Sequence, residues 1–208
     1  MERTHRWAVR SLEAAQVRDT GQALFGIVQG GIHPQLRDAS VAFLTRLPFH
    51  GFAIGGLAVG EEKPHRDAMT ARVAGQLPAD RPRYLMGVGT PLDLVEAVER
   101  GVDMFDCIIP TKMAQQGYAY TFQGLLRITR MVHRVEEVPL DPTCDCVCCV
   151  RHGRAYVHHL MRGKHALGSR LLSIHNLRHY QVLMGRMREA ILGGRFAALA
   201  EEMRALWG

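Results

Sequence analysis

Three cysteine sulfurs and one histidine nitrogen form the most informative group of potential ligands in the sequence. Cys144, Cys146 and Cys149 follow a C-x-C-x2-C spacing, and His175 lies further along the chain. A tight turn can aim three thiolates at one point, and soft sulfur ligands favour a tetrahedral ion such as Zn2+. Because three sulfurs leave one corner of the tetrahedron empty, a histidine can complete a Cys3His site. A site with no open position indicates structural rather than catalytic zinc.

The other cysteines and histidines are weaker candidates. His158 and His159 lie on an expected helix and rank below His175 as the fourth ligand. Cys148 stands beside a ligand, and Cys107 is expected to be a buried thiol. Four of the five cysteines lie within six positions, which is too close for a disulfide framework, and no signal peptide is recognisable. We therefore expect a protein of the reducing cytoplasm.

An acidic residue in an apolar run is the second candidate for chemistry. Asp106 lies within residues 104–109, which have the composition of a short buried strand. A carboxylate at the carboxyl end of a strand can act as a nucleophile, because α/β folds place their sites at that end. It can also cap a helix or a turn, and the local sequence alone favours that interpretation. The nearby Asp103 is interpreted as structural.

Four short apolar runs of similar spacing are expected to form the strands that position these residues. They lie at residues 24–28, 51–55, 84–88 and 104–109. Helical patterns fill the intervals, at residues 35–47, 64–77 and 91–100. This alternation, at roughly 25–30 residues per unit, is typical of parallel βαβ architecture.

The number of units leaves two α/β architectures open. Four βα units make half of an eight-stranded (β/α)8 TIM barrel, which usually needs about 250 residues. A half barrel has two open edges and an apolar inner face, on which we expect Ile27, Ile54 and Leu85. A four-stranded doubly wound sheet avoids that exposure, and periodicity does not distinguish the two.

The pattern changes after Pro110, so we expect two domains, at residues 1–110 and 111–208. The runs at residues 118–122 and 125–128 flank Gln123-Gly124 and predict a β-hairpin. From residue 154 to residue 207 the sequence predicts helices, which are broken near Gly163, Gly168 and Gly193-Gly194. The second domain is therefore expected to be a zinc-binding subdomain with C-terminal helices.

Composition sets only broad limits. The 208 residues are 47% hydrophobic, which is enough for one ordinary globular core. No apolar run approaches membrane-spanning length, so no membrane partner is expected. Lys and Arg number 26 against 20 Asp and Glu, for a formal net charge of +6. That balance is compatible with an acidic or nucleic-acid partner without requiring one.

Six segments in register resemble tRNA-guanine transglycosylase of the bacterial type, which exchanges a guanine of tRNA for a 7-deazaguanine in queuosine modification. They read FGIVQGG at residues 25–31, AIGGLAVGE at 53–61, PRYLMGVG at 82–89, RGVDMFDC at 100–107, LDP at 140–142 and HNL at 175–177. The resemblance covers almost the whole chain, but only the C-terminal half of the family's TIM barrel and its zinc subdomain. It implies a pentosyltransferase fragment, a split-gene product or a shortened relative.

The resemblance implies roles for individual residues. Asp106 matches the nucleophile that attacks the anomeric carbon of the wobble nucleotide and forms a covalent aspartyl-RNA intermediate. The residues that match the base pocket are Gln29, Gly56, Leu57, Val59, Glu61 and Met86. In that set Gln29 would bind the purine edge, Met86 would lie beneath the ring, and Val59 favours preQ1 over queuine. Cys144, Cys146, Cys149 and His175 match the family's Zn2+ ligands.

Two features depart from the family pattern. Where the family has arginines that hold the anticodon loop, Lys112 keeps the charge but lacks the planar fork, and Gln115 lacks the charge. The family's acid/base aspartate belongs to the half that this chain does not resemble. A non-catalytic zinc-containing subunit or an RNA-binding relative is therefore the alternative function. The implied partners are a tRNA anticodon loop, preQ1 or a related base, and a second copy or a complementary N-terminal half.

Overall fold

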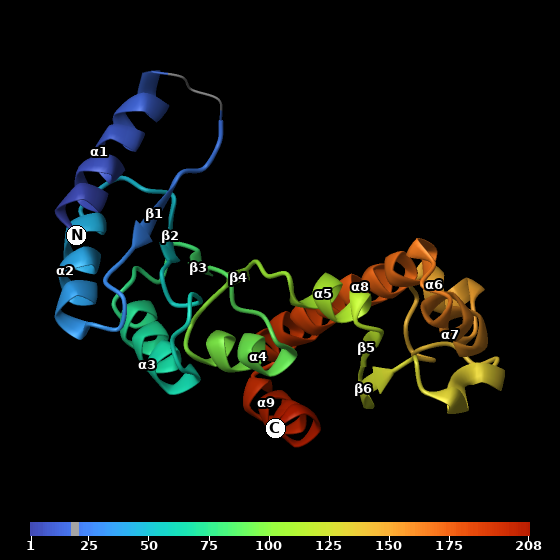
Figure 1. The fold of residues 1–208 in the computed structure, drawn as a ribbon. Helices are drawn as coiled ribbons and strands as arrows, with labels where there is room; N and C mark the ends of the chain where they lie inside the picture. The colour runs from blue at the N-terminus through green and yellow to red at the C-terminus, as the bar shows by residue number, and fades with distance from the viewer. Residues whose placement is uncertain (18–20) are drawn as a thin grey trace. The chain divides into compact units, whose positions relative to one another are not determined.

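The computed structural model describes residues 1–17 and 21–208, which form two compact units (Figure 1). The first, here called the sheet unit, comprises Met1–Gly89 and Asp93–Cys107. The second, here called the metal unit, comprises Thr90–Leu92 and Ile108–Gly208. Each unit has its own cluster of buried apolar side chains, and each is described by itself.

A parallel four-stranded sheet lies at the centre of the sheet unit, as the sequence predicts. Its strands are β1 (Phe25–Val28), β2 (Gly51–Ile54), β3 (Arg83–Leu85) and β4 (Met104–Phe105), in that spatial order. A doubly wound sheet reverses its strand order at a switch point. The unbroken order among the described strands therefore contradicts the doubly wound alternative. With right-handed crossovers, the same order places the connecting helices on one face.

The helices of this unit are α1 (Glu2–Val17), α2 (Pro34–Leu44), α3 (Lys63–Ala74) and α4 (Pro91–Glu99). Of these, α2, α3 and α4 begin where the sequence predicts, to within one residue. Proline in the first turn of α2 and of α3 has a fixed φ that suits a helix start. α2 and α3 end three residues before the predicted ends. Leu47 and Leu77 continue the apolar pattern beyond the helices because they still pack against the core.

Strand register separates a covered face of the sheet from an open face. Val28, Ile54 and Leu85 point into the core that the helices cover, and each is at most 1% exposed. Ile27 lies on the open face and is 37% exposed. The expectation that Ile54 and Leu85 lie on an exposed inner face is therefore wrong. Strand residues alternate between faces, so a shift of one position moves a side chain from one face to the other.

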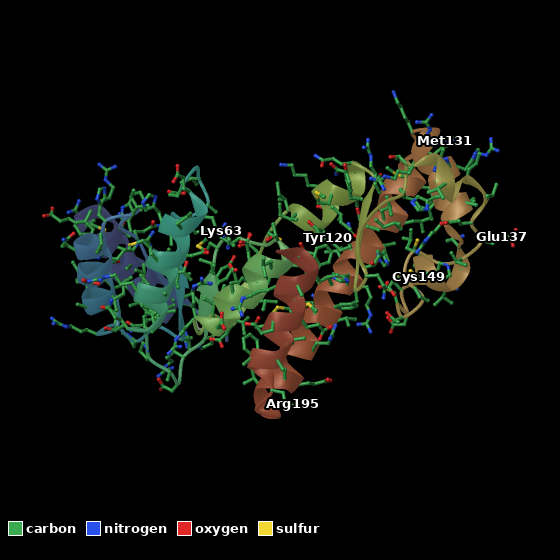
Figure 2. The ribbon with its side chains drawn as sticks, turned by 90° about the horizontal axis from the view of Figure 1, so that it is seen from below. Lys63, Tyr120, Met131, Glu137, Cys149 and Arg195 are labelled. Atoms are coloured by element: carbon green, nitrogen blue, oxygen red, sulfur yellow. The ribbon has the colours of Figure 1, made fainter. Side chains whose placement is uncertain are left out.

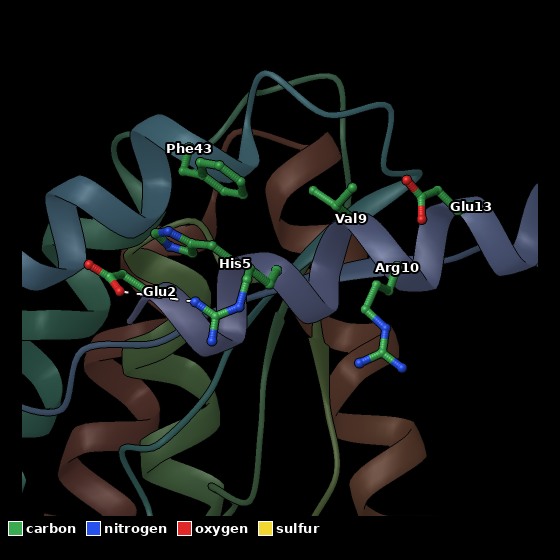
Figure 3. Close-up of a pocket in the computed structure, with 7 residues that line it drawn as sticks. Glu2, His5, Val9, Arg10, Glu13 and Phe43 are labelled. Carbon is green, nitrogen blue, oxygen red and sulfur yellow. Dashed lines mark ion pairs between the residues drawn. The ribbon is translucent and has the colours of Figure 1, made fainter.

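Helix α1 contacts α2 through its first turns. The His5 ring stacks on the Phe43 ring with centroids 4.2 Å apart, and Ala8 and Leu12 pack against the core. A hollow beside this contact (Figure 3) is lined by Glu2, His5, Arg6, Val9, Arg10, Glu13 and Phe43. This hollow includes none of the predicted site residues.

Helices dominate the metal unit, part of which is seen around Tyr120 and Cys149 in Figure 2. Its elements are α5 (Ile109–Gln115), β5 (Tyr118–Thr121), β6 (Gly124–Arg127), η1 (Met131–Val135), α6 (Val147–Arg151), α7 (Arg154–Arg162), α8 (Ala166–Leu192) and α9 (Phe196–Trp207). β5 and β6 pair antiparallel, which confirms the predicted hairpin. Ile109 begins α5, so the strand predicted at residues 104–109 is shorter than expected. Within residues 1–17 and 21–208, no helix has both the length and the apolar content needed to cross a membrane.

Gly168 lies inside α8, so the helix break predicted there is wrong. A Cβ atom at Gly168 would lie 2.9 Å from Met161 Sδ and 3.0 Å from Leu160 Cβ. The absence of a side chain therefore lets α7 and α8 pack closely. The breaks predicted near Gly163 and Gly193 do occur, because α7 and α8 end one residue before these glycines.

Asn176 on α8 holds three backbone groups of the metal unit. Its Oδ1 accepts a hydrogen bond from the Tyr120 N–H at 2.9 Å. Its Nδ2 donates to the carbonyl oxygens of Pro110 at 2.9 Å and Tyr118 at 3.0 Å. The Asn176 side chain is fully buried. Loss of this amide would therefore leave all three backbone groups without these partners.

We predict that Asn176→Ala lowers the free energy of unfolding by about 3 kcal/mol or more, since each buried polar group left unpaired costs roughly 1–3 kcal/mol. Denaturant titration followed by circular dichroism measures the loss. Arg178→Ala on the same helix is the control, because the exposed ion pair of Arg178 with Asp145 contributes only about 0–1 kcal/mol. Equal losses in the two variants would contradict the role of Asn176.

Candidate functional site

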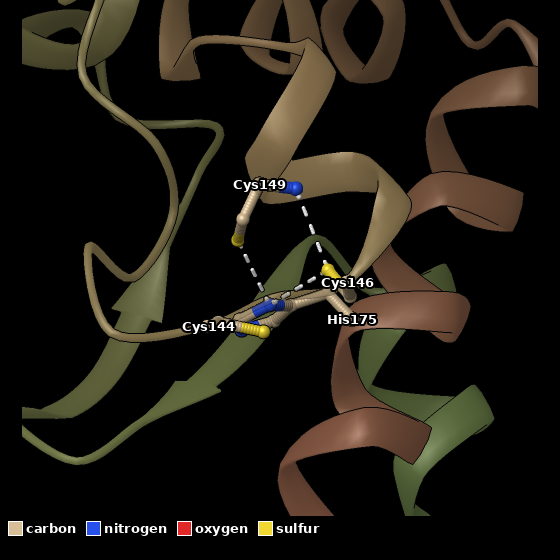
Figure 4. A group of neighbouring side chains, drawn as sticks. All are labelled: Cys144, Cys146, Cys149 and His175. Atoms are coloured by element: carbon tan, nitrogen blue, oxygen red, sulfur yellow. Dashed lines mark hydrogen bonds between the residues drawn. The ribbon is translucent and has the colours of Figure 1, made fainter.

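Four side chains of the metal unit converge on one point (Figure 4). The Sγ atoms of Cys144, Cys146 and Cys149 and a ring nitrogen of His175 lie within 4.8 Å of one another. His175 Nδ1 is 3.3 Å from Cys149 Sγ and 3.7 Å from Cys146 Sγ. A tetrahedral ion with bonds of about 2.0–2.3 Å needs ligand atoms about 3.5–3.8 Å apart. The four predicted ligands therefore lie together in an arrangement that could hold a metal ion.

Local backbone structure explains how the cysteines converge. Cys146 is the N-cap of α6, and its sulfur accepts a hydrogen bond from the Cys149 N–H at 3.4 Å. The cap interaction brings the two sulfurs to the same end of the helix. Before Cys144, the buried carboxylate of Asp141 accepts hydrogen bonds from the N–H and the hydroxyl of Thr143, at 2.8 and 2.7 Å. These bonds fix the turn that presents the first sulfur.

The orientation of His175 is set by the hairpin. Its Nε2 lies 2.8 Å from the carbonyl oxygen of Tyr120, and a carbonyl can only accept a hydrogen bond. Nε2 must therefore carry a proton, which leaves Nδ1 to face the sulfurs. A histidine ligand whose second nitrogen donates to a carbonyl is the usual arrangement in metal sites. The hairpin thus selects the tautomer that a metal ion requires.

The pKa values of the side chains in the cluster are strongly perturbed. Burial lowers the pKa of His175, but hydrogen bonds to Cys144 and Cys146 outweigh burial and raise the pKa to about 9. A hydrogen bond with Cys149 lowers the pKa of Cys146 to about 3 despite burial. The same bond raises the pKa of Cys149. A cation must displace the remaining protons, so its affinity for the cluster rises with pH.

The rival ligands lie outside the cluster. His158 is buried, and its Nδ1 bonds with the carbonyl oxygen of Ile128 at 2.8 Å. His159 is exposed, and its ring lies 6.0 Å from that of His165. Cys148 is fully buried, and burial raises the pKa of its thiol to about 12. A thiol in that environment is inert.

Asp106 lies directly after β4, at the carboxyl end of the strand. Its Oδ1 accepts hydrogen bonds from the Tyr84 hydroxyl at 2.6 Å and from the Gly87 N–H at 2.9 Å. The bond from Tyr84 is the main cause of a lowered Asp106 pKa. The same bond raises the pKa of Tyr84 to about 12. At neutral pH, therefore, the exposed carboxylate is ionised and the hydroxyl beside it keeps its proton.

Asp103 makes different contacts. Its Oδ2 accepts a hydrogen bond from the Arg83 N–H at 2.8 Å, and its own N–H donates to the Arg83 carbonyl oxygen at 2.8 Å. Both bonds join the start of β3 to the segment before β4. They are consistent with the structural role that the sequence suggests for Asp103.

The side chains of Gln29 and Met86 both approach Gly55, which follows β2. A Cβ atom at Gly55 would lie 3.1 Å from Gln29 Nε2 and 3.4 Å from Met86 Sδ, and one at Gly56 would lie 2.8 Å from Gln29 Oε1. Tyr84 and Met86 are two residues apart and therefore share a face. The Asp106 carboxylate, the Gln29 amide and the Met86 thioether thus belong to the open face of the sheet, where they could meet a flat, polar-edged ligand.

The other predicted base-pocket residues differ in exposure. Leu57 as a whole residue is 1% exposed, so its side chain and its backbone are both buried. Val59 is 82% exposed. Glu61 Oε2 accepts a hydrogen bond from the Val59 N–H at 2.9 Å, which lowers the pKa of Glu61. Val59 and Glu61 are therefore held to each other.

Lys112 and Gln115 lie on α5 of the metal unit, and both are exposed. Their side chains are therefore available to a partner of that unit.

Two further residues belong to the candidate site, and no motif in the sequence singles them out. Tyr84 holds Asp106, and the fully buried Arg37 bonds to backbone around Gln29 and Gly56. A signal for Arg37 exists, because it precedes Val41 and Leu44 at the i, i+4, i+7 spacing of a core-facing helix stripe. No comparable signal exists for Tyr84, since its partner is set by strand pairing.

A family profile and individual relatives that match this chain carry the same description. The sequence profile described as Queuine tRNA-ribosyltransferase matches residues 1–208. The protein of that name from Aliivibrio fischeri is 48% identical over 205 residues, which are 99% of this chain and 55% of that protein. The Shewanella denitrificans protein is 49% identical over 202 residues, 97% of this chain and 54% of its own length. The chain thus spans about half the length of the curated relatives it matches.

We predict that Tyr84→Phe raises the pKa of Asp106, because the variant loses the main hydrogen bond to the carboxylate. A lowered pKa contributes stability above the carboxyl's ordinary pKa, and this contribution is lost as pH falls through the lowered value. Tyr84→Phe should therefore weaken this pH dependence. Carboxyl 13C resonances followed against pH measure the shift. Tyr118→Phe, in the metal unit, is the control, and the same Asp106 titration in both variants would contradict the assignment.

Proposed function

The chain belongs to the queuine tRNA-ribosyltransferase family, and from this premise we propose that it acts in exchanging the wobble guanine of tRNA for a 7-deazaguanine. The observation that carries the proposal is the ionised Asp106 carboxylate on the same face of the sheet as Gln29 and Met86. A nucleophile and a purine-sized recognition surface are the two parts that such an exchange requires.

Asp106 would attack the anomeric carbon of the target nucleotide. An ester bond forms between its carboxylate oxygen and the ribose, while the glycosidic bond breaks and guanine leaves with the bonding pair and gains a proton. The incoming base then displaces the carboxylate, loses its own proton and restores the enzyme. Tyr84 and Gly87 occupy Oδ1, which leaves Oδ2 as the attacking oxygen in this proposal.

Base recognition would use both side chains and backbone. The Gln29 amide donates and accepts, so it can pair with a purine edge, and the Met86 thioether offers an apolar surface to the ring. The backbone of Gly56 and Leu57 would meet the exocyclic groups, and Glu61 would lie near the pocket. The branched Val59 favours the small base preQ1 over queuine.

The cysteine cluster would hold a structural Zn2+. Its donor set of three sulfurs and one imidazole matches a closed tetrahedral zinc site, and its two N···S distances of 3.3 and 3.7 Å are close to those around a tetrahedral zinc ion. Such an ion supplies no chemistry to the reaction. It would tie the loop of Cys144 and Cys146 to α8 and so stabilise the metal unit.

The charge distribution supports an RNA-facing role for the metal unit. That unit has 14 Lys and Arg against 7 Asp and Glu, whereas the sheet unit has 12 against 13. The positive excess of the chain therefore resides in the metal unit, which is what attraction to a phosphate backbone requires. Lys112 and Gln115, exposed on α5, would contact the anticodon loop.

The sheet would form part of a (β/α)8 barrel. Its parallel strands follow in sequential order and the core lies on one face, as in a barrel wall. Within residues 1–17 and 21–208, β1 and β4 are the edge strands of the sheet, and these edges together with the exposed Ile27 suit a complementary half or a second copy. A cytoplasmic location, where tRNA is available, follows from the same proposal.

A non-catalytic zinc-containing or RNA-binding subunit is the second candidate. Gln115 favours it, because an uncharged amide cannot hold a phosphate as an arginine does. Formation of a covalent intermediate distinguishes the two functions.

We predict that the chain, combined with the portion of a curated relative that it does not cover, forms a denaturation-resistant adduct with an anticodon-loop RNA. Asp106→Asn should abolish the adduct, since a neutral amide lacks the anionic oxygen that attacks. Denaturing gel electrophoresis with labelled RNA measures it.

Asp103→Asn is the matched control and should retain the adduct. An adduct that survives in Asp106→Asn and disappears in Asp103→Asn would refute the assignment. RNA binding without any adduct in the unsubstituted protein would favour the non-catalytic subunit.

We predict one zinc ion per chain and its loss in Cys149→Ser, because a hydroxyl is a poor ligand for zinc. Thermal stability should fall together with zinc content, since the ion contributes folding free energy directly. Elemental analysis and calorimetry measure the two quantities. Cys148→Ser is the control, because this neighbouring cysteine lies outside the cluster. Equal zinc content in both variants would disprove the ligand set.

A further inference from the structure

Arg37 on α2 is a fully buried arginine whose side chain donates three hydrogen bonds to backbone carbonyl oxygens. Its Nε donates to the Gly31 carbonyl oxygen at 2.8 Å, and its Nη1 donates to that of Val28 at 2.9 Å. Its Nη2 donates to the Gly56 carbonyl oxygen at 3.3 Å. Val28 is the last residue of β1 and Gly31 lies in the segment that follows, so these two acceptors flank Gln29, and Gly56 lies in the segment after β2. One guanidinium thus joins the two segments that carry the proposed base pocket.

Burial of this cation is costly and unnecessary for packing alone. Burial lowers the pKa of Arg37 to about 10, partly offset by the charge of Glu61, so the guanidinium stays protonated at neutral pH. Val41 and Leu44 continue the same core-facing stripe with apolar side chains. An apolar residue at position 37 would pack there without the desolvation penalty of a charge. We therefore attribute the presence of a guanidinium at position 37 to the backbone carbonyl groups that it binds.

Because a peptide unit is planar, a hydrogen bond to its carbonyl oxygen also fixes the orientation of its N–H group. The Val28 carbonyl and the Gln29 N–H share one rigid plane, so fixing one fixes the other. That plane is bound on both sides, because the Gln29 N–H also donates to Ser40 Oγ at 3.2 Å. In the same way, the bond to the Gly56 carbonyl fixes the direction of the Leu57 N–H.

We propose that Arg37 is a positioning residue for the purine base, setting the Gln29 loop against the Gly56–Leu57 backbone. This inference rests on the proposed base-exchange function and adds a specificity element to it. The geometry is close, since a Cβ atom at Gly30 would lie only 2.9 Å from the Arg37 backbone nitrogen. A side chain of different shape cannot reach all three carbonyl oxygens. Lysine, with one point charge, is expected to hold at most one loop.

The test compares Arg37→Lys and Arg37→Met with Val73→Ala. Val73 is fully buried on α3 in the same core but contacts neither loop by a side-chain hydrogen bond, so its truncation lowers stability without touching the pocket. Amide hydrogen exchange of the chain itself, at residues 29–32 and 56–59, reports loop order. Guanine affinity is measured by calorimetry on the chain combined with the portion of a curated relative that it does not cover. The melting temperature of each variant shows whether the variants are destabilised to a similar extent.

Both Arg37 variants should show faster exchange at the two loops and at least a tenfold weaker guanine affinity. Val73→Ala, at a similar or larger loss of melting temperature, should leave both readouts unchanged. Unchanged loop exchange in Arg37→Met, or equal guanine weakening in Val73→Ala, would overturn the inference. If the loops loosen in the Arg37 variants but the unsubstituted chain, combined with the portion of a curated relative that it does not cover, binds no guanine, Arg37 still orders the two loops and the proposed base-exchange function is what fails.

Discussion

Tyr120 has both of its backbone polar groups bound by consecutive residues of α8. Asn176 accepts from its N–H, and His175 bonds with its carbonyl oxygen. Because neighbouring helix residues point in different directions, the two bonds fix the hairpin in position and in rotation. The same helix residue that holds the hairpin therefore presents its other nitrogen to the cysteines. The geometry of the metal cluster and the packing of β5 on α8 therefore depend on the same two side chains, those of His175 and Asn176.

The sheet unit uses the same device with a different side chain. A pocket built from backbone needs irregular segments, and irregular segments leave N–H and C=O groups that cannot remain unpaired when buried. In the metal unit an amide on a long helix satisfies such groups, and in the sheet unit a guanidinium on α2 does so. In both cases a rigid helix supplies a polar side chain with several donors or acceptors. Loop geometry thus becomes as well defined as the helix that holds it.

The sequence predicts the elements of this fold better than their contacts. Strands and helices follow from apolar runs, and the ligand cluster follows from cysteine spacing, because both signals are local. The sequence does not reveal which face of the sheet Ile54 and Leu85 occupy. Alternation along a strand shows that neighbouring side chains lie on opposite faces, but not which of the two faces is covered by the helices. Gly168 was misinterpreted because a glycine that permits close helix packing looks the same in sequence as one that ends a helix. The bond between Tyr84 and Asp106 depends on the pairing of β3 with β4, which no local pattern encodes.

The way Asp106 is held also bears on how a carboxylate can remain a nucleophile. A cation in direct contact would lower its pKa further, but it would form an ion pair that an attacking oxygen must break. The groups that hold Oδ1 are a phenol hydroxyl and a backbone N–H, both neutral donors, and the phenol keeps its proton because its own pKa is raised. They favour the ionised form and fix its direction while leaving the negative charge uncompensated. In the proposed reaction that charge would be available to the electron-poor anomeric carbon, where a glycosidic bond develops positive charge as it breaks. Neutral donors at Oδ1 and an open sheet face beside it therefore make the lowered pKa of Asp106 compatible with the nucleophilic role proposed for it.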